Sequence, residues 1–339
     1  MIADKKFRIP YKSVDFPSGT VASEGELEAD WGDLIWAALT IGRPNICHAL
    51  AHGEASIYEA LFRLSLLRMA VEQRPGKAYL FRTRVFSELD PTEKGAVSYF
   101  LGMAVCKLFA YQKLGTPWLL HLDVFRHQLD PIIVGGRSRP DLVGQNHHSG
   151  NWQAFECKGR STMPSAEEQR KAKKQAQRLI KVNGADCDLH VGAITYFLRE
   201  KLEFYWWDPK PESSEELPQV AVKLTQDAWR HYYAPALALA RDGMGEDMSV
   251  TRTVASIEEE NRKDVRLGAG DVDVQIRADV RELLEAGDWK GARLQAPKIR
   301  DTRVKSFKLE EEEFKPDGLR IRAGAAWREN RDSERGTNR

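Results

Sequence analysis

Two short apolar segments, separated by a polar stretch, constrain the fold of this chain more than any other feature. They are residues 139–144 (RPDLVG) and 155–159 (FECKG). Each carries one acid, Asp141 or Glu156, and the second also places Lys158 two residues after its glutamate. Alternate residues of a strand point to the same face of a sheet, so Glu156 and Lys158 are expected to share one face.

The stretch between these segments, residues 145–150, is polar and short, as a hairpin turn requires. Pairing of the two segments as a hairpin would bring two carboxylates and one ammonium group together. Carboxylates supply the hard oxygen ligands that Mg²⁺ or Mn²⁺ prefers, and a neighbouring lysine can orient or deprotonate the attacking water. The pattern therefore predicts a divalent-metal phosphodiesterase site.

Hydrophobic periodicity surrounds the hairpin with helices and further strands. The clearest helix is predicted over residues 90–114, with Asp90 as its N-cap and Pro91 in its first turn. A charged helix is predicted over residues 164–180. Further strands are predicted at residues 118–125, 152–158, 189–198 and 202–207. The first three strands of this region can form a meander, and the second helix allows a parallel return, which predicts an α/β sandwich with a mixed sheet.

The flanking regions give different patterns. Helices are predicted over residues 24–39 and 56–73, and a strand over residues 77–86. After residue 208 come an acidic linker, a helix over residues 224–241 that is rich in aromatic residues, a short helix over residues 276–285 and a charged tail. We therefore predict three regions: an N-terminal, mainly helical region (1–87), a core (88–207) and a C-terminal helical and charged region (208–339) that is partly mobile or bound to a partner.

Composition limits the class of protein. The net charge of +1 gives no global attraction to nucleic acid, so any such attraction must come from local patches. The four cysteines are scattered and form no CxxC motif, which predicts buried free thiols in a reducing compartment. The chain has no signal peptide and no long apolar run, so we expect a cytoplasmic protein without membrane contact.

The order of predicted elements, together with RPD at 139–141 and ECK at 156–158, resembles the PD-(D/E)XK nuclease superfamily. The resemblance covers roughly residues 88–207. It implies a restriction-endonuclease-like α-β-β-β-α-β core with a mixed central sheet flanked by helices. It also implies that Asp141 and Glu156 are ligands of Mg²⁺ or Mn²⁺, that the backbone carbonyl of Cys157 is a third ligand, and that Lys158 is the catalytic lysine.

The same resemblance implies further residues. Many members carry an acid on the helix before the sheet, and Glu93 is the best match, although it could equally favour the helix dipole. Some members carry a Gln or Lys on the helix after the ExK strand, a role open to Gln169, Lys173 and Lys174. Basic residues beside the acids would attract a phosphate backbone; these are Arg139 and Arg160.

Other interpretations use the same residues differently. Asp141 could cap a turn while Glu156 and Lys158 form an exposed ion pair, in which case the motif is accidental and the carboxylates lie far apart. His147 and His148 are interpreted as a solvent-exposed turn or a groove contact with nucleic acid, because no third metal ligand is spaced nearby.

The function expected from the sequence is a metal-dependent endonuclease or exonuclease that acts on DNA rather than RNA, with bacterial phage defence or restriction as a role suggested by analogy. The alternative is a non-catalytic nucleic-acid-binding subunit of a larger nuclease or helicase complex. The N- or C-terminal region could bind a protein partner. Double-strand cleavage with one site per chain would favour a homodimer.

Overall fold

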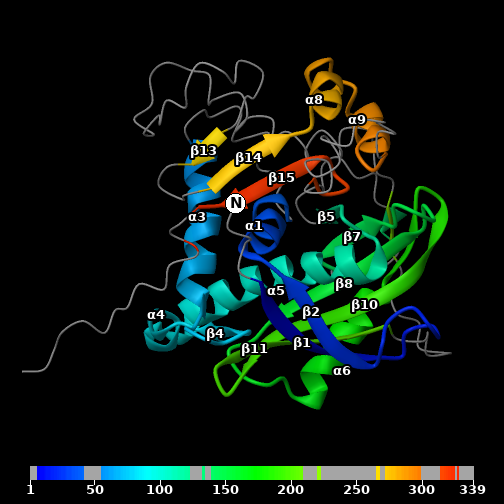
Figure 1. Ribbon diagram of the computed structural model, residues 1–339. Coiled ribbons are helices and arrows are strands. Elements are labelled where there is room, and N and C mark those ends of the chain that lie inside the picture. The colour runs from blue at the N-terminus through cyan, green and yellow to red at the C-terminus, as the bar shows by residue number, and fades with distance from the viewer. Residues whose placement is uncertain are drawn as a thin grey trace, which may run out of the picture.

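A mixed sheet forms the centre of the protein in the computed structural model (Figure 1), with strand order β2-β1-β11-β10-β8-β7-β5. The structure describes residues 6–41, 55–122, 132–133, 139–208, 220–222, 265–267, 272–298, 314–324 and 327. The strands of this order, from one edge to the other, are β2 (Glu24–Ala29), β1 (Phe7–Val14), β11 (Lys201–Trp207), β10 (Ala185–Leu198), β8 (Trp152–Gly159), β7 (Leu142–Gln145) and β5 (Leu119–His121). Short strands extend the sheet, namely β3 (Val71–Gln73), β4 (Leu80–Arg82), β6 (Ile132–Ile133), β9 (Leu179–Val182) and β12 (Val220–Val222).

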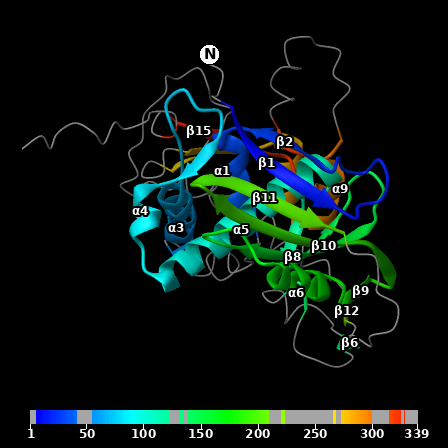
Figure 2. The same cartoon turned by 90° about the horizontal axis from the view of Figure 1, so that it is seen from below.

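Strands β5, β7 and β8 form the predicted antiparallel meander. Helix α6 (Ala166–Ala176) then leads to β10, which pairs with β8 in parallel. In Figure 2, α6 lies on the side of the sheet where β9, β12 and β6 continue it. The expected mixed α/β fold, with a meander and a parallel return, is therefore confirmed.

Helix α5 (Pro91–Leu114) covers the other face of the same strands. Its start follows from the sequence, because Asp90 accepts hydrogen bonds from the Thr92 and Glu93 N–H groups and Pro91 occupies the first turn. Helices on both faces explain why β8 is buried along almost its whole length.

Two glycines on α5 differ in what surrounds them. A Cβ atom on Gly95 would meet nothing within 4 Å, whereas a Cβ atom on Gly102 would lie 2.9 Å from the backbone oxygen of Lys158. Gly102 therefore lets the α5 backbone approach β8 at the lysine of the ECK motif.

Alanine substitution should separate these two glycines. Gly95→Ala is expected to stabilise the protein by about 0.5–1 kcal/mol, because alanine has the higher helix propensity. Gly102→Ala should instead destabilise it by about 1–3 kcal/mol, because α5 must shift away from β8. Urea unfolding of the two variants measures the difference, and equal stabilities would contradict the close approach.

The N-terminal predictions were partly wrong. The segment predicted as one helix over residues 24–39 is strand β2 followed by α1 (Trp31–Thr40), because Asp30 and Asp33 form a capping box that starts the helix late. Strand β1, which contains Pro10, was missed although its burial alternates. This N-terminal region thus supplies strands to the central sheet in addition to helices.

The next two N-terminal elements also differ from their predictions. The helix predicted over residues 56–73 is the shorter α3 (Ala55–Ala70). Residues 71–73, predicted as the end of that helix, form β3 instead. The strand predicted over residues 77–86 is the shorter β4 followed by α4 (Arg84–Glu88), which Thr83 caps.

A second, small sheet lies near the C-terminus, formed by β13 (Val265–Leu267), β14 (Val272–Ile276) and β15 (Leu319–Ala323). Helices α8 (Ala278–Glu285) and α9 (Trp289–Gln295) follow β14, and α8 confirms the predicted short helix. Strand β15 packs on α1, which lies between the small sheet and α5 (Figure 1). The predicted linker and the helix over residues 224–241 lie outside the described residues.

Within the described ranges, no helix has the length and apolar character to cross a membrane. Three of the four cysteines are buried free thiols, as the sequence predicts: Cys106, Cys157 and Cys187. The fourth, Cys47, lies outside the described residues.

Candidate active site

Asp141 and Glu156 meet where β7 and β8 separate. The pairing of these strands begins at Leu142 and Phe155. One residue further out, Oδ2 of Asp141 accepts a hydrogen bond from the Cys157 N–H at 2.8 Å. In return, Oε2 of Glu156 accepts one from the Asp141 N–H at 3.2 Å. These reciprocal bonds hold both carboxyl groups at the open end of the hairpin, so the two acids of the motif do not lie far apart.

Lys158 completes this group. Its Nζ donates a hydrogen bond to Oε1 of Glu156 and forms an ion pair with it. The Glu156 side chain is 1% exposed and that of Lys158 is 24% exposed, so within this ion pair the lysine is the partner that contacts solvent. Both residues are in register with the α6-facing side of β10. Cys157 faces α5 instead, where its free thiol is hydrogen-bonded to the thiol of Cys106.

Burial dominates the electrostatics of this group. Burial and, to a smaller extent, the neighbouring Asp141 carboxylate together raise the pKa of Glu156 to about 8, against the opposing effect of Lys158. A cation that binds this carboxyl group near neutral pH therefore competes with a proton. Ionising both carboxyl groups places two negative charges side by side, so an added positive charge is stabilising at this site.

The donor set fits Mg²⁺ or Mn²⁺. Asp141 and Glu156 supply hard oxygen atoms, and Mg²⁺ is commonly held by one or two carboxylates together with water and substrate phosphate. The Cys157 carbonyl points to the same edge as its N–H, which faces Asp141. Among the described residues no three His, Cys, Asp or Glu side chains gather around a common point. The two carboxylates and this carbonyl are thus the ligands that the described residues offer here.

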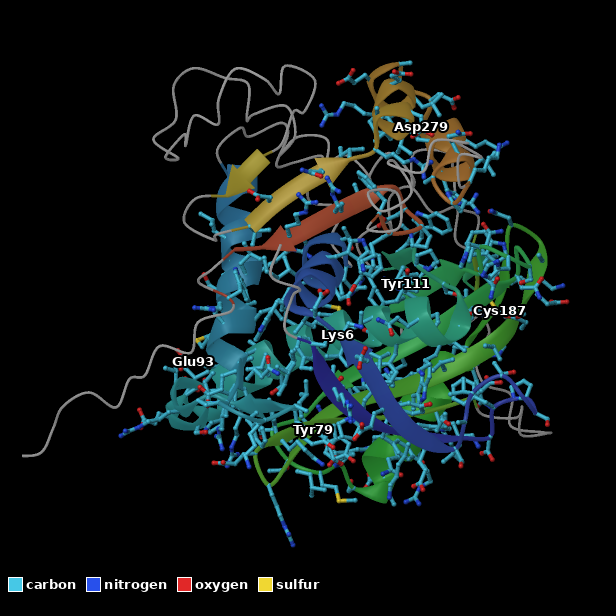
Figure 3. The ribbon with its side chains drawn as sticks, viewed as in Figure 1. Lys6, Tyr79, Glu93, Tyr111, Cys187 and Asp279 are labelled. Carbon is cyan, nitrogen blue, oxygen red and sulfur yellow. The ribbon has the colours of Figure 1, made fainter. Side chains whose placement is uncertain are left out.

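Glu93 does not join the two acids. It lies exposed at the α4 end of α5 (Figure 3), and its Oε2 accepts a hydrogen bond from the Asp90 N–H at 3.4 Å. That bond is half of the capping box that starts α5. The structure therefore gives Glu93 the helix-terminal role that the sequence left open.

The candidate contacts on α6 separate by position. Gln169 and Lys173 are half-buried on the same side as the buried Ala172 and Ala176, the side turned to the sheet, whereas Lys174 is exposed. Two arginines flank the acids in sequence. Arg160 pairs with Glu168 at 2.6 Å, which ties the end of β8 to α6, and Arg139 is half-buried just before Asp141.

The two histidines of the hairpin turn serve the fold. The His147 N–H donates to the carbonyl of Gly115 at 2.9 Å, and Asn146 Nδ2 donates to that of Leu114 at 2.6 Å. These carbonyls lie at the C-terminal end of α5, where no further helical turn supplies N–H donors. Burial lowers the pKa of His147. The turn therefore caps α5; His148 is exposed as predicted, whereas His147 is half-buried.

One neighbouring pair was not foreseen. The hydroxyl oxygen of Tyr99 on α5 and Nε2 of His121 on β5 lie 3.2 Å apart. His121 pairs with Leu142, the residue after Asp141. Nothing in the sequence indicates this contact, because it depends on the angle at which α5 crosses three strands.

No protein-family model matches the chain, and no curated protein or solved structure matches it either. The inference of a function therefore depends on the geometry of Asp141, Glu156 and Lys158.

Proposed function

We propose that the chain is a divalent-metal-dependent nuclease of the PD-(D/E)XK type that hydrolyses phosphodiester bonds, with DNA as its expected substrate. The observation that carries this proposal is the joining of Asp141, Glu156 and Lys158 at the open end of one hairpin. If the short strands β6 and β9 are set aside, the order is α5, β5, β7, β8, α6, β10, with a meander and a parallel return. This order supports the proposal, because it is the α-β-β-β-α-β order that the superfamily implies.

Each residue has a defined task in this proposal. Asp141, Glu156 and the Cys157 carbonyl would hold Mg²⁺ or Mn²⁺, which when bound supplies Lewis-acid stabilisation of the negative charge on the phosphate. Lys158 orients the attacking water as an ammonium group held by Glu156, or takes the proton of that water as the free amine; its side chain is partly open to solvent. Its positive charge also stabilises the phosphate in the transition state.

The basic residues near the site would hold the nucleic-acid backbone. Lys174 is exposed on α6, and Gln169 and Lys173 lie on the half-buried side of that helix. Arg160 and Arg139 flank the acids. Such contacts act on phosphates rather than bases, so they predict binding that weakens as salt increases and that depends little on sequence.

Cleavage assays with purified full-length chain test the proposal. Plasmid, linear and single-stranded DNA are incubated with Mg²⁺, Mn²⁺ or EDTA, and Lys158→Ala is purified in parallel. Cutting is expected with either metal, absent with EDTA and absent in the variant. Equal cutting by Lys158→Ala would overturn the proposal. Salt-sensitive binding without cutting would favour the binding-subunit alternative, and the preferred DNA would distinguish endonuclease from exonuclease.

The location, biological role and assembly of the protein are further parts of this proposal. From the resemblance and from composition we propose a cytoplasmic location and a role in phage defence or restriction. We also propose a homodimer and a protein partner bound by the N- or C-terminal region. Size-exclusion chromatography with light scattering, with and without DNA, measures the oligomeric state directly.

The pH dependence of metal binding gives an independent prediction. Because the pKa of Glu156 is raised to about 8, a bound cation must displace its proton below that pH. Affinity for Mn²⁺ should therefore rise by about tenfold per pH unit between about pH 6 and 8 and level off above. Calorimetry in buffers of different ionisation enthalpy counts the released proton. A pH-independent affinity in this range would contradict the prediction, and Glu156→Gln should lack the slope.

A further inference from the structure

Glu156 is covered unevenly by its neighbours. Its carboxyl group accepts hydrogen bonds from the Asp141 N–H on the β7 side and from Nζ of Lys158 on its own strand. On the opposite side, Gly192 of β10 lies next to Glu156, and glycine has no side chain that could cover the glutamate. Even so, Glu156 is 1% exposed. Other atoms must therefore fill the space above Gly192.

The indole of Trp207 fills this space. Trp207 on β11 pairs with Gly192, so the two residues face the same side of the sheet. A Cβ atom at Gly192 would lie 3.1–3.3 Å from three atoms of the Trp207 ring. Neighbouring strands are about 5 Å apart, so a ring that covers Gly192 stands beside Glu156.

The ring is itself held in place. Trp207 is 4% exposed and belongs to a buried cluster that joins the sheet to α6. The other members of this cluster are Ala172, Ile194 and Tyr196. A wall fixed in this way can restrict the rotamers of the neighbouring glutamate.

We propose that Trp207 is a positioning residue of the candidate active site: its indole closes the β10 side of Glu156 and directs the carboxyl group toward Asp141 and Lys158. The metal-binding consequence rests on the proposed function, whereas the positioning of the side chain does not. Without the ring, Glu156 can turn into the space above Gly192. Loss of such a supporting contact typically costs about 10- to 100-fold in metal affinity or activity.

The adjacent tryptophan provides a matched control. Trp206 is fully buried on the opposite face of the same strand, with its ring centroid 5.5 Å from that of Phe109 on α5. Trp207→Leu and Trp206→Leu each remove one buried indole from β11, so both should lower the melting temperature. Only Trp207→Leu should raise the Mn²⁺ concentration for half-maximal cleavage, by about 10- to 100-fold, and Trp207→Phe should recover part of the loss.

Crystal structures of the two variants give a readout that needs no metal. In Trp207→Leu the Glu156 carboxyl group should leave the Asp141 N–H, which it contacts at 3.2 Å in the parent chain, whereas in Trp206→Leu it should stay. An unmoved carboxyl group, or equal Mn²⁺ shifts in both variants, would overturn the inference. If the parent chain bound no Mn²⁺, the proposed function would fail while the two structures still decided the role of Trp207.

Discussion

Asp141→Asn is expected to reduce metal-dependent cleavage by about three orders of magnitude while the protein remains folded. A bound ion contributes several kcal/mol to transition-state stabilisation, and each 1.4 kcal/mol corresponds to about tenfold in rate. The amide keeps the shape of the side chain, and its oxygen can still accept the hydrogen bond from the Cys157 N–H. The substitution therefore removes the charge with little change in packing. Single-turnover cleavage with Mn²⁺ and a thermal unfolding curve measure the two expectations.

Glu93→Gln is the matched control for this prediction. It also removes one carboxylate from the region that resembles the superfamily, but Glu93 lies in the capping box of α5 rather than beside Asp141. Glutamine can form the same box, so stability and cleavage should both remain close to those of the parent chain. A loss of cleavage in Glu93→Gln similar to that in Asp141→Asn would mean that Glu93 reaches the metal when DNA binds. Unchanged cleavage in Asp141→Asn would refute the site.

The arrangement of the hairpin acids could be predicted from sequence because it is local. Asp141 and Glu156 lie close in sequence, on two strands joined by a short turn, and the two-residue spacing places Lys158 on the same face as Glu156. The start of α5 was equally predictable, since Asp90 and Pro91 act within one helical turn. In both cases neighbouring residues determine the structure.

Features that depend on distant contacts could not be predicted in this way. Strand β1 contains Pro10, which reads as a turn residue, yet it pairs in parallel with β11 almost two hundred residues later. Trp207 stands beside Glu156 only because β8, β10 and β11 pair in one particular register. A single sequence does not specify that register, so the residue had no visible link to the site.

Distant contacts also join the C-terminal segment to the core. Asp317 is fully buried just before β15, and it accepts hydrogen bonds from Nε1 of Trp36 at 2.7 Å and from the Leu319 N–H at 3.1 Å. Its charge also acts on Lys107 of α5. That lysine is fully buried and donates to Oγ1 of Thr40 at 2.5 Å. The aspartate thus compensates a buried cation on the helix that supports β8.

Asp317→Ala is therefore expected to destabilise the protein by about 3–5 kcal/mol at pH 5, where Lys107 is charged and would lose its compensating carboxylate. The pKa of Lys107 is lowered to about 7, chiefly by burial and to a smaller extent by Arg63, against the opposing effect of Asp317. Between pH 7 and about 10.5 the unfolded chain thus binds a proton that the folded chain has lost, and stability rises with pH in that window. The loss in Asp317→Ala should accordingly be smaller at pH 10, where Lys107 is neutral in the folded chain, than at pH 5, where it is charged.

Urea unfolding at both pH values tests this prediction, with Glu285→Ala as an exposed acidic control on α8 that should change stability by less than about 0.5 kcal/mol. Removing both charges with Lys107→Met and Asp317→Asn should recover much of the loss, because no buried charge is then left alone. A loss below about 1 kcal/mol in Asp317→Ala, typical of an ordinary hydrogen bond, would show that Lys107 does not depend on Asp317. Cleavage by the folded fraction of Asp317→Ala should stay normal, which separates its effect on stability from the effect of Asp141→Asn on chemistry.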